Sequence, residues 1–220
     1  MNNLKQISVN AAVIVLLVWL TGCGVPSVHP LYEPEDLIIN ESLTGTWVKD
    51  DGKTTWEVAS LAWLSEQWAL DTDRHEDLKF LFELDSLGLG NGYIIQQNGN
   101  GDYVYVAGLV ELGGNYYLDL YKLDFNTDVF SFPVHIFMKV SYNDDRIEMH
   151  MFSEEWLREL IRNRQVRIRY EESFMGEFLL TASTRDLKKF VEKYGDVEEA
   201  YAQTETYRKI SDTPRFLLED

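Results

Sequence analysis

Apolar and polar residues alternate over several short stretches of this chain, which is the period of strands that bury one face. Turn residues separate these stretches, including Asp-Gly at 51–52, Asn-Gly at 98–99 and Asn-Asp-Asp at 143–145. The clearest predicted strands are 46–49, 54–58, 92–97, 102–112, 116–123, 134–142 and 146–152. Strands joined by short turns predict an antiparallel meander. We therefore expect a mainly β fold whose sheet curls into a barrel or half-barrel.

The C-terminal half departs from this period twice. Ser153, followed by two glutamates, begins a predicted helix of about ten residues. A second short helix is predicted from Thr184, and Gly195 ends it. Less regular strands are expected at 78–84, 166–171, 177–182 and 206–210, the last of which closes the sheet.

The segment Ala59–Asp77 fits neither the helical nor the strand period. It carries Trp63 and Trp68, which are unfavourable in a loop unless something covers them. Two interpretations follow. The segment packs across the open end of the barrel as a lid, or it presents its tryptophans to a partner, for which Trp is a favoured anchor.

The N-terminus has the pattern of an export signal. Residues 11–20 form an unbroken apolar run, which at about ten residues is too short for a membrane span of ~20 residues. Residues 1–22 are therefore interpreted as a signal peptide. Residues 23–42, with several prolines, are expected to be a semi-extended tether, and residues 43–220 a single domain.

Leu20-Thr21-Gly22-Cys23 resembles the lipobox of bacterial lipoproteins. The resemblance implies cleavage before Cys23 and attachment of diacylglycerol to its thiol, with three acyl chains in all, enough for stable membrane attachment. Cys23 is the only cysteine, so the chain has no internal disulfide. Gly24 replaces the aspartate that retains many lipoproteins at the inner membrane, which favours the outer membrane.

The net charge of the chain limits the classes of partner that it can bind. Removing Lys5 with the signal peptide leaves 19 of the 20 basic residues against 37 acidic ones, a formal charge of −18. This field repels nucleic acid, which excludes a nucleic-acid function, and it repels anionic head groups. We therefore expect the lipid on Cys23 to attach the protein to the membrane without electrostatic help.

Gly45-Thr46-Trp47 resembles the Gly-x-Trp motif that opens the first strand of lipocalins. The resemblance implies an eight-stranded barrel with Trp47 plugging its closed end, and it points to Arg208 as the arginine that lipocalins carry near the C-terminus. Other motifs resemble a group of bacterial lipoproteins without an assigned activity, with 64–89 as an insertion. These motifs are His29–Tyr32, Leu109–Gly114, Leu118–Tyr121, Pro133–His135 and Leu180–Thr184.

The residues give no support for catalysis. His75 begins like a zinc-binding helix, but the residue four positions later is Lys79. His135 and His150 fall on neighbouring predicted strands and are candidates to face each other. The acid-rich segment 71–77 lacks the glycine and glutamate of a calcium loop, and no Gly-x-Ser-x-Gly elbow is present. We expect no enzyme activity, metal or cofactor.

Aromatic residues suggest a binding role. The 6 Trp, 12 Tyr and 11 Phe residues either line an apolar ligand pocket or fill the barrel as core. Our preferred hypothesis is a non-catalytic domain that binds a hydrophobic small molecule, with Trp47, Trp63 and Trp68 as candidate pocket or lid residues. The alternatives are a protein–protein interaction platform in the cell envelope and an enzyme of unrecognised type.

Overall fold

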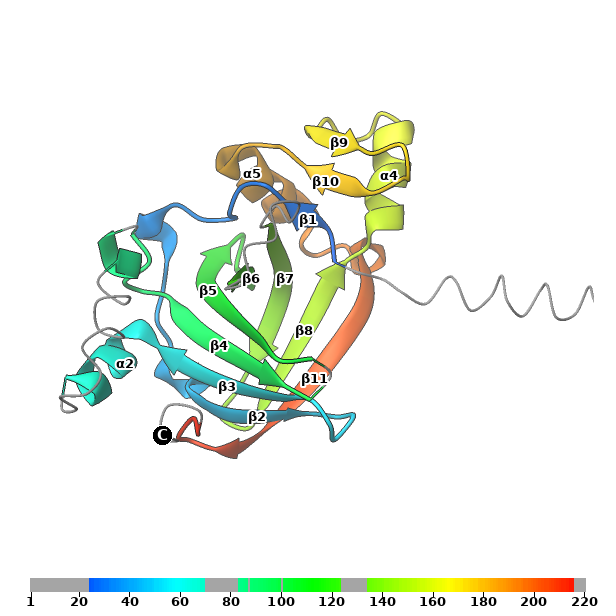
Figure 1. The fold of residues 1–220 in the computed structure, drawn as a ribbon. Helices are drawn as coiled ribbons and strands as arrows, with labels where there is room; N and C mark the ends of the chain where they lie inside the picture. Colours follow the sequence, from blue (N-terminus) through cyan, green and yellow to red (C-terminus); the bar gives the residue numbers. More distant parts are fainter. Residues whose placement is uncertain (1–23, 70–82, 87, 100, 124–133, 216–220) are drawn as a thin grey trace, which may run out of the picture.

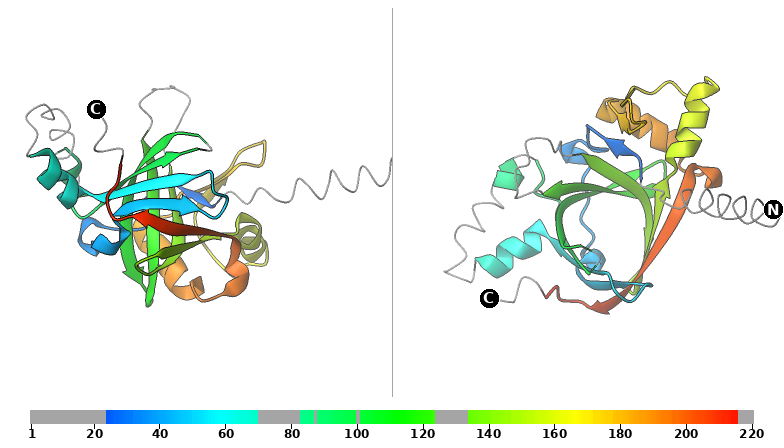
Figure 2. Two further views of the ribbon diagram at one scale, coloured as in Figure 1. Left: turned by 90° about the horizontal axis from the view of Figure 1, so that it is seen from below. Right: turned by 45° about the vertical axis from the view of Figure 1, so that its right-hand side comes forward.

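The computed structural model describes residues 24–69, 83–86, 88–99, 101–123 and 134–215. Eight antiparallel strands form a closed barrel (Figures 1 and 2). They are β2 (Gly45–Lys49), β3 (Thr55–Ser60), β4 (Tyr93–Asn98), β5 (Tyr103–Leu112), β6 (Asn115–Leu123), β7 (His135–Tyr142), β8 (Arg146–Phe152) and β11 (Tyr201–Ser211). The pairing of β6 with β7 closes the circle, so the predicted meander and its closure by the last strand are confirmed.

A second layer lies outside the barrel, between β8 and β11 in sequence. It consists of α4 (Glu154–Arg162), β9 (Tyr170–Glu172), β10 (Phe178–Leu180), α5 (Thr184–Tyr194) and the 3-10 turn η3 (Glu198–Ala200). The two C-terminal helices are confirmed, with Ser153 and Ser183 as their N-caps. Only short parts of the strands expected at 166–171 and 177–182 form, and they lie outside the barrel. Residues 166–169 are not in a strand, so the first of these two predictions is wrong except for its last two residues. They join the barrel through β1 (Pro26–Ser27), which pairs with both β10 and β7.

The barrel has two different ends. We call the mouth the end where the β2–β3 and β4–β5 turns lie and β7 begins. The closed end is the opposite one, where β2 begins and the β7–β8 turn lies. Along each strand, side chains alternate between the interior and the outer wall, as the pleat requires. The buried interior side chains include Trp47, Trp56, Val58, Ile95, Leu109, Leu118, Met138, Val140, Met149 and Tyr207.

The outer wall is also buried where the second layer covers it. Phe137 and Phe152 of the barrel pack in one cluster with Leu187, Phe190 and Val191 of α5. The domain therefore has a second core outside the barrel, which explains why the strands on this side are apolar on both faces.

The expectation of a tether at 23–42 is wrong for the described residues 24–42. Val25, Leu31, Tyr32 and Leu37 are buried in the outer core, and the 3-10 turns η1 (Pro34–Asp36) and η2 (Glu41–Leu43) lead into β2. Gly108 of β5 permits this close packing, because an added Cβ would lie 2.7 Å from both Tyr32 and Leu37. The prolines shape this segment while its apolar residues fasten it to the barrel.

In the described part of the Ala59–Asp77 segment, Ala59 and Ser60 end β3 and a helix follows. Ser60 caps α2 (Leu61–Trp68) by accepting a hydrogen bond from the backbone N–H of Trp63 (3.1 Å). Leu64 and Trp68 pack against outward-facing residues of β3, β4 and β5, beside the closed end. The lid across the open end is therefore wrong for residues 59–69, and residues 70–77 lie outside the described residues.

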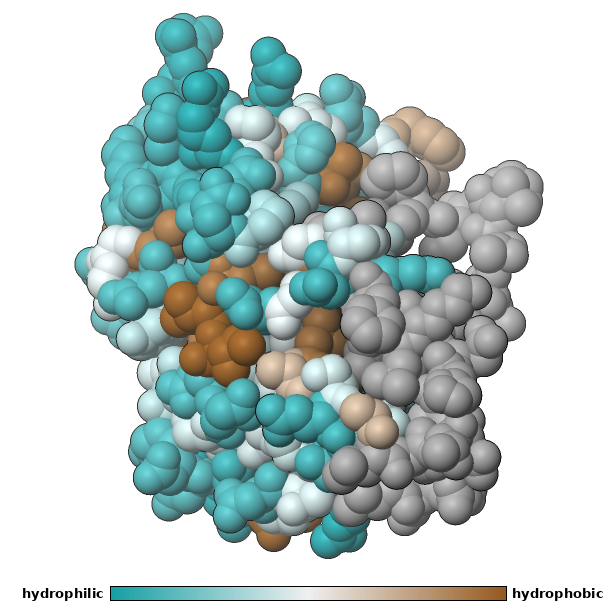
Figure 3. All heavy atoms as spheres, turned by 90° about the vertical axis from the view of Figure 1, so that its left-hand side faces the viewer, coloured by the Kyte–Doolittle hydropathy of each residue, from teal (hydrophilic) through white to brown (hydrophobic). Residues whose placement is uncertain are grey.

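Residues 83–86 are helical, so the strand expected at 78–84 is wrong for its last two residues, and 78–82 lie outside the description. Among the described helices, none is long and apolar enough to cross a membrane. Figure 3 views the side that carries α2. Hydrophilic residues dominate this face, and its largest apolar area lies near the middle.

Candidate functional site

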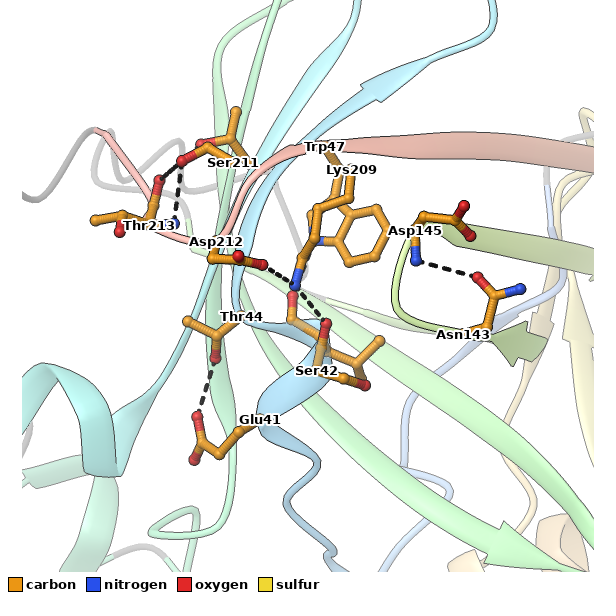
Figure 4. Close-up of polar contacts among 12 residues, drawn as sticks. Glu41, Ser42, Thr44, Trp47, Asn143, Asp145, Lys209, Ser211, Asp212 and Thr213 are labelled. Atoms are coloured by element: carbon orange, nitrogen blue, oxygen red, sulfur yellow. Dashed lines mark hydrogen bonds and ion pairs between the residues drawn. The ribbon is translucent and has the colours of Figure 1, made fainter.

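The closed end is fastened by Trp47 and Lys209 (Figure 4). Trp47 is fully buried and donates from Nε1 to the Leu43 carbonyl (2.9 Å). The Lys209 ammonium lies 5.1 Å from the Trp47 ring centre and donates to the Ser42 carbonyl (2.9 Å). The predicted plug at Trp47 agrees with this geometry. Arg208, to which the lipocalin resemblance points, is the residue just before Lys209 on β11.

Strand alternation explains why Arg208 is not the partner of Trp47. Lys209 pairs directly with Trp47 and shares its inward face, so the adjacent Arg208 points outward. The Arg208 side chain is 65% exposed and lies 3.4 Å from the Asp50 carboxylate. The structure therefore places Lys209, and not Arg208, against Trp47.

Polar groups at this end satisfy one another. The backbone N–H of Asn40 donates to the Tyr93 hydroxyl (2.6 Å), which donates back to the Asn40 carbonyl (3.2 Å). The Asn40 side chain donates to the Tyr142 hydroxyl (3.1 Å). Burial raises the pKa of Tyr93 well above its ordinary value, so the ring stays neutral. The hydrogen bonds among Asn40, Tyr93 and Tyr142 therefore close this end of the barrel, next to Leu43 and Trp47.

The interior next to this seal is filled. The cavity among Leu43, Trp56, Tyr93, Ile95 and neighbouring apolar side chains has a volume of about 20 Å³. That is close to the space of a single water molecule. This part of the barrel has no room for an organic ligand in the described structure.

Toward the mouth, the interior becomes polar and half-exposed. Strand register places eight side chains on the inner face above Trp56, which we call the mouth layer. These are Lys49, Gln97, Tyr103, Tyr105, Lys122, Met151, Gln203 and Glu205. None of them is fully buried, so this layer of the described interior is in partial contact with solvent.

An ion pair crosses the mouth layer. Lys49 Nζ lies 2.6 Å from Glu205 Oε1, and the two side chains are 25% and 12% exposed. Glu205 also accepts from Gln203 (3.1 Å) and from the Tyr207 hydroxyl (3.3 Å). Burial, together with the nearby Glu205 carboxylate, raises the pKa of Tyr207, which stays protonated and able to donate.

Aromatic rings surround this ion pair. The Trp56 and Tyr207 rings lie 4.9 Å apart between centres, and Trp56 donates from Nε1 to the Gln97 side chain (3.1 Å). The Tyr105 pKa is raised by burial and by its neighbours Tyr103 and Glu205. The exposed Lys122 ammonium lies 4.4 Å from the Tyr103 ring centre. The layer therefore offers apolar ring faces beside fixed charges and hydrogen-bonding groups.

The remaining predicted tryptophans lie elsewhere. Trp68 is the last residue of α2 and is buried against the outer wall of the barrel. Trp63 is half-buried and lines an open groove of about 800 Å³ at the closed end, with Glu41, Glu66, Asp144, Lys209 and other residues. The structure does not bring Trp47, Trp63 and Trp68 into one pocket. The mouth layer was not predicted, because only the strand register shows which polar residues share the inner face.

The two histidines on β7 and β8 do not face each other, which corrects that expectation. His150 pairs with Lys139, four residues from His135 along β7, and contacts Thr204 at 2.9 Å. His135 instead contacts buried Asp119 (Nδ1 to Oδ1, 2.7 Å). Asp119 also accepts from the Leu31 backbone N–H (2.7 Å), so it fastens the N-terminal segment to β6.

The other candidate positions add no site. His29 is exposed, and His75 with the acid-rich segment 71–77 lies outside the described residues. Within the described ranges, no group of three or more potential ligands is placed to hold a metal ion.

Searches with family models, curated proteins and solved structures find no match to this chain. The fold is therefore described from the strand order alone. It is an antiparallel eight-stranded barrel of lipocalin-like form, with a buried aromatic cluster inside.

Proposed function

We propose that the mature protein is a lipid-anchored, non-catalytic binding domain of the bacterial cell envelope. In this proposal the barrel holds a hydrophobic small molecule with a polar head group at its mouth. The observation that supports ligand binding is the change of the interior along the barrel axis. A filled apolar layer at the closed end gives way to a half-exposed layer of rings and charges at the mouth.

The chemistry of the mouth layer suggests how such a ligand lies. Binding pockets are mostly apolar and use a few polar groups to orient the ligand. The rings of Tyr103 and Tyr105 offer apolar contacts, while Lys122 is exposed and suited to an anionic or hydrogen-bonding head group. Because the layer below Trp56 is filled, the apolar part of the ligand stays in the upper half of the barrel.

The anchor and location rest on the sequence. Leu20–Cys23 supports cleavage and acylation at Cys23, and Gly24 favours the outer membrane. Membrane attachment would hold the mouth close to a source of amphipathic molecules, which is consistent with the proposed ligand class.

Two neighbouring positions on β11 provide a matched test. Gln203 faces the mouth interior and Thr204 faces outward, and both are exposed. We expect Gln203→Trp to fill the mouth and weaken binding of oleic acid by about tenfold or more, because the indole ring takes up space that the ligand needs. Thr204→Trp should bind like the wild type. Native mass spectrometry of the mature protein, with oleic acid as the probe, measures the bound fraction.

Absence of a bound oleic acid on the wild type, or equal binding by both variants, would contradict a ligand site at the mouth. The interaction-platform alternative would then gain support. The observation in its favour is the groove beside Trp63, where a tryptophan lies next to Glu41, Glu66 and Asp144. Its partner would be a cationic protein segment, since carboxylates dominate the rim.

A further inference from the structure

The β9–β10 hairpin exposes two large apolar side chains at its tip. Phe174 is 98% exposed and Met175 is 74% exposed, the highest values among the large apolar residues that the structure describes. Water-exposed apolar residues that lie side by side at a loop tip mark a contact surface more often than isolated ones do. Neither α4 nor the barrel covers them.

The tip is rigid. Ser173 accepts hydrogen bonds at its hydroxyl from the backbone N–H of Met175 (3.2 Å), and Gly176 adopts a φ of +86° that closes the turn. Arg158 of α4 donates to the Gly176 carbonyl (2.6 Å) and so ties the tip to the helix. Phe174 and Met175 are thus held out by a fixed loop, which lowers the entropic cost of binding.

The chain that follows the anchor cysteine starts on the side of this tip. β1 runs parallel to β10, with Ser27 level with Leu180. Going back along β1 toward Cys23 is therefore the same direction as going back along β10 toward Gly176. Cys23 precedes Pro26 by three residues, a reach of at most about 10 Å.

The barrel mouth lies on this side as well. Gly24 is buried, and a Cβ added to it would lie 3.0 Å from Ile136 and 3.9 Å from Met151, which are inward-facing residues at the mouth ends of β7 and β8. Figure 1 shows α4, β9 and β10 on the side of the barrel where β8 ends. The first described residues therefore lie at the mouth, and the hairpin lies on the same side of the barrel.

We propose that Phe174 and Met175 dock in the surface of the bilayer that holds the Cys23 lipid, so that the barrel mouth faces the membrane. This inference rests on the proposed lipid anchor. The proposed contact is made by the two apolar side chains alone. The residues that flank them, Glu171, Glu172 and Glu177, are acidic and are not attracted to anionic head groups; of these three, Glu172 is paired with Arg158 (2.8 Å). The proposed contact therefore agrees with the acidic charge of the chain, which disfavours an electrostatic contact.

The single cysteine makes this orientation measurable. Acylation consumes the Cys23 thiol, so Met175→Cys in the mature lipoprotein offers one site for a nitroxide label. The matched control is Ile210→Cys, which is 52% exposed and lies near the closed end of β11. Both labelled proteins are reconstituted in vesicles of phosphatidylethanolamine and phosphatidylcholine, and power saturation compares contact with oxygen and with a water-soluble nickel chelate.

We expect the label at 175 to lose nickel contact and gain oxygen contact on vesicles, while the label at 210 stays accessible to nickel. A Phe174→Cys label should behave like the one at 175. Equal nickel contact at 175 and 210 on vesicle-bound protein overturns the proposal and leaves a protein partner for the tip. Failure of the anchor is a different result, since the protein would then not float with the vesicles.

Discussion

At the scale of single residues, the closed end depends on a few buried contacts around one indole. Trp47 combines full burial, a hydrogen bond to the Leu43 carbonyl and the Lys209 ammonium over its ring. A cation held over an indole and partly shielded from water adds to the burial energy of the ring. Lys209 also reaches the Ser42 carbonyl, so the pair joins β11 to the segment before β2.

Trp47→Ala should lower the free energy of unfolding by about 3–5 kcal/mol, as truncation of a buried aromatic does. Trp63→Ala is the matched control, because Trp63 is only half-buried and should cost much less. Urea unfolding of both variants measures the difference. A loss below ~1 kcal/mol for Trp47→Ala would show that this ring is peripheral to the core.

The sequence predicted Trp47 but not its partner, and the reason is physical. Gly-x-Trp is a local motif, whereas the residue that meets Trp47 is 162 positions away and depends on the register of β11. A shift in that register between Lys209 and Ser211 makes the inward position still harder to infer. For the same reason, the sequence did not predict that Asp119 contacts His135. The two residues lie on the adjacent strands β6 and β7 but are not directly paired.

At the scale of elements, the N-terminal segment is fastened to the second layer by an ion pair. Lys188 of α5 lies 2.6 Å from the Asp36 carboxylate in η1. Partial burial alone would raise the Asp36 pKa, but hydrogen bonds from Lys188 and from the Glu33 backbone outweigh it and lower the pKa below 3.8. A lowered pKa in the folded state means that ionised Asp36 stabilises the fold.

Asp36→Asn should therefore destabilise the protein by up to about 1 kcal/mol above the ordinary pKa, the range of partly exposed ion pairs. The difference between wild type and variant should shrink as the pH falls from about 5 to about 3, because Asp36 becomes protonated in the wild type. Urea unfolding across this range measures it. In a Lys188→Gln background the variant should cost less, and an unchanged cost there would contradict the ion pair.

Elements with strong local signals were predicted correctly, and weaker ones were missed. The barrel strands follow the alternation of apolar and polar residues, and Ser153 marks the N-terminus of α4 as its N-cap. The helix α2 has only eight residues and three buried positions, too few for a clear helical period. The N-terminal segment was taken for a tether because its prolines obscured the apolar residues that pack on the barrel.

At the scale of the whole molecule, our proposal is that the second layer sets which end of the barrel faces the membrane. The parallel pairing of β1 with β10 links the residues after Cys23 to the hairpin tip, and Gly24 lies against the mouth. The pairing of β1 with β10 joins residues about 150 positions apart, and the contacts of Gly24 are also far apart in sequence, so no local pattern predicted them. They bring the proposed ligand site and the proposed membrane contact to one side of the domain.

The proposed location and the proposed membrane contact both depend on the attachment at Cys23, so the mass and N-terminus of the protein extracted from membranes test this central claim most directly. We expect a mature chain that begins at Cys23 and carries diacylglycerol on the thiol with a further acyl chain on the amine. Cys23→Ala should remain an uncut precursor without lipid mass. A mature N-terminus at another residue, or a free thiol at Cys23, would contradict the lipid anchor.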